Sequence, residues 1–94
     1  MESYKDLAAR LNLSDREKDG LACCVGRSET FKEAEWRTAY IPAKLKGEGL
    51  VDPLWFHDEE ADEIGFSWQR SVQGEGLFQH FLSLGYVVPP KPAA

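Results

Sequence analysis

The sequence lacks the features that mark several large classes of protein. No apolar run approaches the roughly 20 residues that a transmembrane helix needs, and the charged residues 1–6 predict no signal peptide. Only two cysteines are present, Cys23 and Cys24, and neighbours in a regular helix cannot form a disulfide with each other. We therefore expect a soluble, cytoplasmic protein with reduced thiols and no membrane partner.

Motifs that carry chemistry are equally scarce. His57 precedes a run of carboxylates, but the spacing fits neither the calcium loop of an EF-hand nor the helical histidine pair of a zinc protease. Cys23 and Cys24 lack the two-residue spacer of zinc or redox pairs. The other histidine, His80, is expected to be structural. We therefore expect a protein that is not an enzyme and that binds no metal and no cofactor, and an enzyme or metal-binding domain is a third alternative.

The acidic residues are concentrated in one short segment. The chain has 16 acidic and 11 basic residues and a net charge of −5, and residues 58–63 contain five acids and no base. Charged runs of this kind commonly form solvated loops. A cluster this dense also creates a negative field that repels phosphate and attracts basic surfaces, so a function in binding cations or basic proteins must be considered.

With 94 residues, 43% of them hydrophobic, the chain suffices for one domain with a modest core. Apolar spacing predicts a first set of helices over 3–11, 14–26, 31–39 and 42–48. Ser14 and Glu17 form a capping box at the start of the second helix, and Thr30 and Glu33 form another at the start of the third. These signals predict that the first half of the chain is helical.

The helices before and after Pro42 predict a helix-turn-helix. Pro42 disfavours helical geometry at the preceding residue and suits the first position of a new helix. Gly49 suits the end of that new helix.

A β-hairpin and a last helix are predicted for the second half. Residues 50–56 form the first strand, with Pro53 restricting it to an edge. Ile64, Phe66 and Trp68 alternate with small or polar residues, as in a strand with one buried face. The loop between the strands, residues 57–63, places the acidic cluster at the hairpin tip.

The last helix is predicted over residues 74–84, with Gly85 in a left-handed cap and Tyr86 packing back onto the helix. Its apolar stripe includes Phe78 and Phe81, which either pack in the core or form a homodimer interface. The domain plan is an N-terminal helix over 1–13, a main unit over 14–86 and a flexible, proline-rich tail over 87–94.

This order of elements resembles a winged helix-turn-helix domain. The resemblance rests on the helices over 14–26 and 31–39, on the break at Tyr40-Ile41-Pro42, and on residues 44–51, which are similar to a recognition helix that runs into the first wing strand. It implies an α+β fold, winged helix-turn-helix-like, with four to five helices and a two-stranded β-hairpin wing.

The resemblance also implies a nucleic-acid-binding surface. In this family the second helix of the motif enters the major groove and the wing contacts the backbone. The groove-facing candidates here are Arg37, Lys44 and Lys46, with Arg70 near the base of the wing. The acidic tip departs from this pattern, because a wing that carries five acids works against the binding of duplex DNA.

The sequence therefore supports two hypotheses of function. The first is a small acidic protein that binds a basic protein surface, by analogy with the anti-CRISPR inhibitors of phages and mobile elements that mimic DNA charge. Tryptophan is a favoured interface anchor, and Trp55 is expected near the surface beside the acids. Its site would comprise Trp55, Asp58, Glu59, Glu60, Asp62 and Glu63. The alternative is a DNA-binding winged-helix transcriptional regulator.

Overall fold

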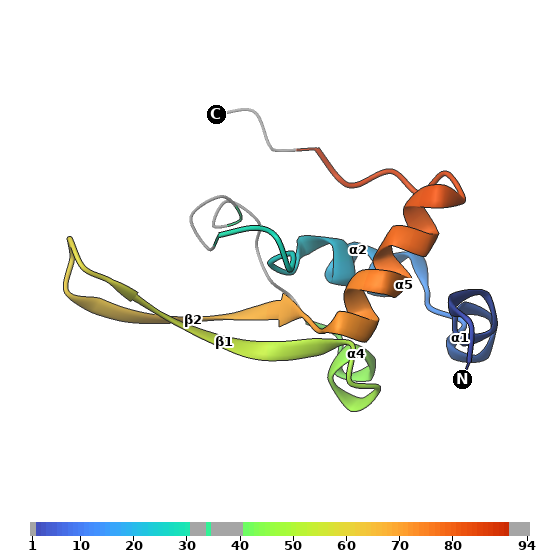
Figure 1. Ribbon diagram of the computed structural model, residues 1–94, viewed down its shortest axis with the longest axis horizontal. Helices are drawn as coiled ribbons and strands as arrows, with labels where there is room; N and C mark the ends of the chain where they lie inside the picture. Colours follow the sequence, from blue (N-terminus) through green and yellow to red (C-terminus); the bar gives the residue numbers. More distant parts are fainter. Residues whose placement is uncertain (1, 31–33, 35–40, 91–94) are drawn as a thin grey trace.

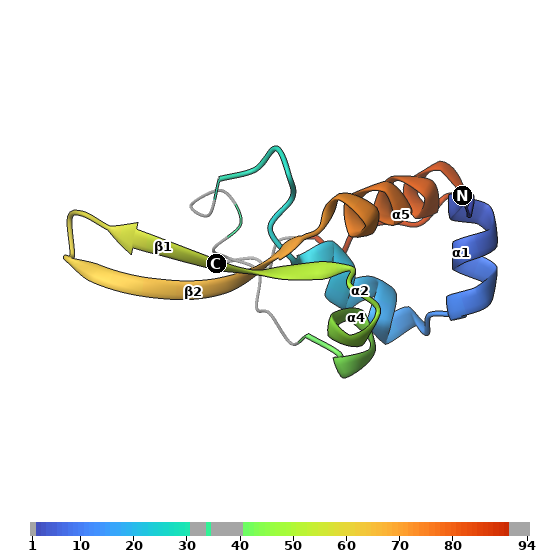
Figure 2. The ribbon, with the colours of Figure 1, turned by 60° about the horizontal axis from the view of Figure 1, so that its bottom comes forward.

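The computed structural model describes residues 2–30, Ala34 and residues 41–90. In these ranges the chain forms four helices and a two-stranded antiparallel hairpin, which confirms the predicted α+β class (Figure 1). The helices gather at one end of the molecule, and the hairpin projects away from them in both views (Figures 1 and 2). This long arm accounts for the elongated outline of 44 × 30 × 22 Å.

The first two helices follow their capping signals. Helix α1 spans Tyr4–Leu11, and helix α2 spans Asp15–Cys23. The capping box is confirmed, because the Glu17 amide donates to the Ser14 hydroxyl oxygen and the Ser14 amide donates to the Glu17 carboxylate. Helix α2 ends three residues before its predicted end at residue 26. The reason is tertiary: Val25 leaves the helix to form a parallel bridge with Gln69.

The predicted third helix, residues 31–39, lies outside the described residues except for Ala34, which is helical and buried. Its capping residue Glu33 and the candidate Arg37 therefore also lie outside them. The next helix, α4, spans Ala43–Gly47, within the predicted range of 42–48, and Pro42 is its N-cap rather than its predicted first residue. Gly49 follows with a φ of 68°, which confirms the predicted break after this helix.

The hairpin is longer than predicted and its loop is shorter. Strand β1 spans Val51–Asp58 and strand β2 spans Glu63–Arg70. The prediction of a seven-residue loop over 57–63 is wrong, because Asp58 pairs with Glu63 and leaves only residues 59–62 in the turn. The additional residue pairs lengthen the strands, so that more backbone N–H and C=O groups are hydrogen-bonded within the protein.

Helix α5 spans Val72–Ser83 and begins two residues before its predicted start. Ser71 explains the earlier start, because its hydroxyl oxygen accepts the Gly74 amide and its hydroxyl donates to the Gly49 carbonyl. The predicted left-handed cap is confirmed by a φ of 97° at Gly85. Tyr86 packs back as predicted, with its ring centroid 6.5 Å from that of Phe78.

The core lies where the helices meet the base of the hairpin. Phe78 and Phe81 are both buried in it, which favours the first of the two alternatives for these side chains, packing in the core. Val88 also packs partly against the core, within the segment 87–94 that was predicted to be flexible. The fully buried side chains at the centre of the core belong to Leu21, Cys24, Leu45, Leu50 and Leu77.

None of the helices in the described part of the chain has the length and apolar character needed to cross a membrane.

Candidate functional site

The register of the hairpin places four large apolar side chains on one face. Trp55 pairs with Phe66, and the neighbouring pairs on the same face are Pro53 with Trp68 and His57 with Ile64. Side chains two residues apart on a strand share a face, so these residues form one surface. We call Trp55, Ile64, Phe66 and Trp68 the aromatic face.

The aromatic face is open to solvent along most of its length. The exposed fraction is 68% for Trp55, 75% for Ile64 and 45% for Phe66, whereas Trp68 is partly buried against the core. The predicted surface position of Trp55 is confirmed. The prediction that Ile64 and Phe66 belong to a buried face is wrong, because both side chains are exposed. The hairpin that carries them projects beyond the helices (Figures 1 and 2).

The rings of this face contact one another, Trp55 with Phe66 across the two strands and Phe66 with Trp68 along β2. The Trp55 and Phe66 centroids are 4.8 Å apart with an interplanar angle of 57°, and the Phe66 and Trp68 centroids are 5.3 Å apart with an angle of 80°. Tilted and edge-to-face contacts are the favoured geometries of aromatic pairs. The aromatic face is therefore a preorganised surface rather than a set of independent side chains.

The opposite face of the hairpin holds Phe56 over Gly65. A Cβ atom added at Gly65 would lie 1.9 Å from Cζ of Phe56, so the ring rests directly on the glycine backbone. Covering a strand glycine with an aromatic side chain on the partner strand restores packing that the glycine lacks. This contact helps to keep the arm paired as far as the tip.

The acidic tip consists of residues 58–63, and its described side chains are exposed. Asp62 adopts a φ of 50°, which Asp tolerates in a turn. Nε2 of His57 lies 3.2 Å from Oδ1 of Asp62. Asp58 and Glu63 occupy directly opposed positions, which is unfavourable for like charges. The tip therefore presents concentrated negative charge at the end of the arm.

The basic residues of the DNA-binding alternative have contacts within the protein. The Lys44 ammonium group donates to the Leu11 carbonyl at the end of α1. Nζ of Lys46 lies 5.5 Å from the centroid of the Trp68 ring, which is a cation–π contact. Arg37 lies outside the described residues. The contacts of these two lysines weigh against their use as free phosphate-binding groups.

Arg70 is in the interior, not on the surface. Its exposed fraction is 4%, which differs from the surface position that DNA binding requires. Nη1 donates to the carbonyls of Leu21, Ala22 and Cys24 at distances of 3.0 to 3.2 Å. These carbonyls end α2, where a helix has unsatisfied acceptors and a partial negative charge. Arg70 therefore caps α2 from 46 or more positions away in the sequence.

Two carboxylates and a ring complete the surroundings of Arg70. Its Nε lies 3.3 Å from Oε1 of Glu75, its Nη2 lies 3.6 Å from Oε1 of Glu29, and its guanidinium carbon lies 4.1 Å from the centroid of Phe78. Burial alone would raise the pKa of Glu75, but hydrogen bonds from the Arg27 amide and from Gln79, with the charge of Arg70, lower it overall. This network joins α2, the base of the hairpin and α5.

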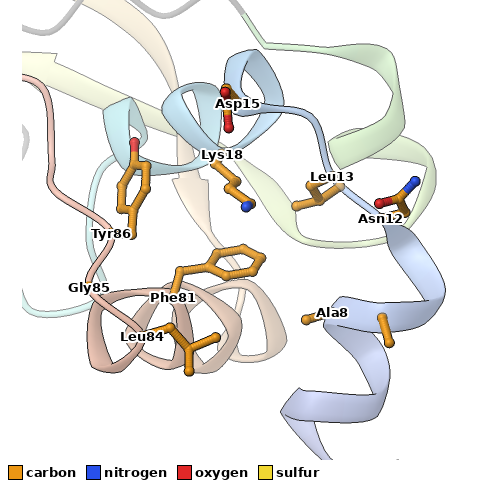
Figure 3. A pocket seen from close by; sticks show the side chains of 10 residues that line it. Ala8, Asn12, Leu13, Asp15, Lys18, Phe81, Leu84, Gly85 and Tyr86 are labelled. Carbon is orange, nitrogen blue, oxygen red and sulfur yellow. The ribbon is translucent and has the colours of Figure 1, made fainter.

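A cavity of about 470 Å³ lies between α1, α2 and the end of α5 (Figure 3). Figure 3 shows the Lys18 side chain reaching toward the Phe81 ring, with Nζ 5.1 Å from its centroid. The Tyr86 hydroxyl donates to Asp19 at 2.6 Å, and burial together with this carboxylate raises the pKa of Tyr86. The contacts of Lys18 and Tyr86 hold the helices together, and no sequence signal had pointed to this cavity.

Groups for metal or thiol chemistry do not gather in the described part of the chain. There, no three His, Cys, Asp or Glu side chains are close enough to hold a metal ion. Cys24 is buried, and its thiol lies 3.3 Å from the Gly20 carbonyl. Compared with this cavity, the hairpin presents the larger group of exposed aromatic and acidic side chains to solvent.

The chain matches no known family model, and neither a curated protein nor a solved structure matches it significantly.

Proposed function

We propose that this protein is a small, non-enzymatic interaction protein that binds a basic protein surface through the acidic tip of its hairpin. The observation that carries the proposal is the position of the tip. Five acids occupy six residues at the end of an arm that projects from the helices. A negative field on such a protrusion steers association with positively charged partners.

The pairing of the other charges supports the tip as the binding element. The structural arginines have carboxylate partners elsewhere: Arg70 contacts Glu29 and Glu75, and Arg10 contacts Glu2 and Glu48. Outside residues 58–63 the chain has 11 acidic and 11 basic residues, so the net charge of that part is zero. The excess charge is therefore directed outward at the tip.

We further propose that the partner surface is one that normally holds nucleic acid. An anionic protrusion presents carboxylates where a nucleic acid presents phosphates, and a basic groove attracts both. The protein would then be an inhibitor by charge mimicry, as in the anti-CRISPR analogy. The helices and the hairpin of the described residues fit the general α+β class, and we propose a winged helix-turn-helix scaffold for them. A fold of that shape does not dictate DNA binding.

Affinity purification from a native lysate, followed by mass spectrometry, tests the proposal. The informative variant neutralises the tip through Asp58→Asn, Glu59→Gln, Glu60→Gln, Asp62→Asn and Glu63→Gln. A matched control removes the same amount of charge from exposed acids elsewhere, through Glu2→Gln, Asp6→Asn, Asp15→Asn, Glu48→Gln and Asp52→Asn. We expect the wild type and the control to capture the same basic protein and the tip variant to lose it, with unchanged circular dichroism.

Capture that persists after neutralisation of the tip would contradict the proposal. Equal loss from both variants would also contradict it, because net charge rather than the tip would then control binding. Retention of duplex DNA at low salt, weakening as salt rises, would favour the regulator alternative instead.

A further inference from the structure

The aromatic face leaves three large apolar side chains open to solvent. Trp55 and Ile64 are more than half exposed although both are strongly apolar, and Phe66 connects them to the base of the arm. Contiguous apolar surface on a projecting element marks a docking site. Indole rings are also among the commonest anchors of protein interfaces.

The negative charge next to the aromatic face favours a cationic partner. The tip begins at Asp58, three residues beyond Trp55 on β1, which is about 10 Å along a strand. A second copy of this chain would bring five more acids to the same region. A cationic segment is complementary both to the negative tip and to the faces of the aromatic rings.

The protein already shows that this face accepts a cation. At the base of the arm, the Lys46 ammonium group lies over the Trp68 ring. In the interior, the guanidinium group of Arg70 lies 4.1 Å from the centroid of Phe78 while it pairs with Glu75. This Arg70 arrangement combines an aromatic ring with a carboxylate around one guanidinium group. At the outer end of the arm, the exposed rings of Trp55 and Phe66 supply the aromatic component. The exposed turn acids Glu59, Glu60 and Asp62, beyond the end of the aromatic face, supply the carboxylates.

We propose that the aromatic face binds an arginine-rich segment of the partner, with guanidinium groups stacked on Trp55 and Phe66. Further arginines of the same segment pair with the tip carboxylates. This inference rests on the proposed function and specifies the partner's chemistry. In an extended segment, alternate side chains lie about 7 Å apart on one face, so arginines at alternate positions reach both the rings and the tip.

Arginine fits this surface better than lysine does. The guanidinium group is planar and weakly hydrated, stacks on aromatic rings and pairs with carboxylates in a bidentate manner. The ammonium group of lysine is compact and strongly hydrated, so it loses more solvation when it rests on a ring. The aromatic face therefore predicts a preference between two cations of equal charge, which the acidic tip alone does not.

Isothermal titration with two peptides tests the inference. The peptides have equal length and charge, one alternating arginine with serine and the other lysine with serine. We expect the wild type to bind the arginine peptide roughly three- to tenfold more tightly. Trp55→Leu should abolish this preference and Trp55→Tyr should keep most of it. Ile64→Thr should leave the ratio unchanged, because it removes apolar surface and no ring.

Any other outcome of these titrations contradicts the inference. Equal affinity of the wild type for both peptides, or a preference that survives Trp55→Leu, overturns the arginine inference and leaves the proposed function standing. Binding of neither peptide overturns both. A dimer in sedimentation velocity that Trp55→Leu dissociates shows that a second copy covers the face, and this also overturns the inference.

Discussion

The guanidinium carbon of Arg70 lies 4.1 Å from the centroid of the Phe78 ring, so the last residue of the hairpin is stacked on the helix that follows it. The same group donates to three carbonyls at the end of α2. Arg70 is thus the junction between the arm and the helices, and it fixes the base from which the arm projects.

Replacement of Arg70 should destabilise the whole protein. Arg70→Met leaves the α2 carbonyls, Glu29 and Glu75 without their cation, and removal of one partner from a buried charged network costs about 3–5 kcal/mol. Arg70→Lys should also destabilise, because it keeps the charge but loses the planar donor fork. Urea unfolding measures both free energies. The exposed Arg10→Met is the control and should have a small effect, so equal effects at the two positions would contradict this role.

Substitution by alanine should have different effects on stability at two glycines, Gly74 and Gly47. A Cβ at Gly74 would lie 1.9 Å from the carbonyl oxygen of Leu50, a backbone atom that cannot rotate away. Gly74→Ala should therefore lower the free energy of unfolding by about 2–4 kcal/mol. Gly47 has no atom within 4 Å of such a Cβ, so Gly47→Ala should be neutral or should stabilise by up to about 1 kcal/mol. Thermal melting compares them, and a Gly74→Ala variant that melts like the wild type would contradict the close packing of α5 on Leu50.

Acid should destabilise the protein partly through Glu75. The pKa of this carboxyl lies below its usual 4.5 in the folded chain, because hydrogen bonds and Arg70 outweigh burial. A lowered pKa contributes stability above the unfolded value, and that contribution is lost as pH falls through the folded value. Urea unfolding between about pH 7 and about pH 3 should therefore show a smaller loss for Glu75→Gln than for the wild type. Parallel pH curves for the two proteins would exclude this role of Glu75.

The elements that the sequence predicted well depend on neighbouring residues. The capping box of Ser14 and Glu17, the break at Gly49 and the left-handed Gly85 are all local features, and the structure confirms them. The tip was found because its acids are contiguous in the chain. Trp55 was found because neighbouring side chains on a strand point to opposite faces.

The features that could not be predicted from the sequence depend on contacts between residues that are far apart in the chain. Arg70 was named as a DNA-binding candidate through the resemblance to a winged helix-turn-helix domain. Its α2 acceptors lie more than 40 positions away in the sequence, so no local signal showed that it is buried. The alternation of Ile64 with Phe66 identified a shared face, but alternation does not reveal whether another layer covers it. The early end of α2 follows from the bridge between Val25 and Gln69, which no local signal announces.

The central claim is that the acidic tip binds cationic partners and not DNA. The most direct test measures the binding of two labelled ligands to this protein at low ionic strength. Fluorescence anisotropy is measured with a short random duplex DNA and with a basic, arginine-rich peptide. Attraction of cations to the tip predicts saturable binding of the peptide, lost when the five tip acids are neutralised, and no binding of the duplex. Binding of the duplex, with no binding of the peptide, would contradict the account.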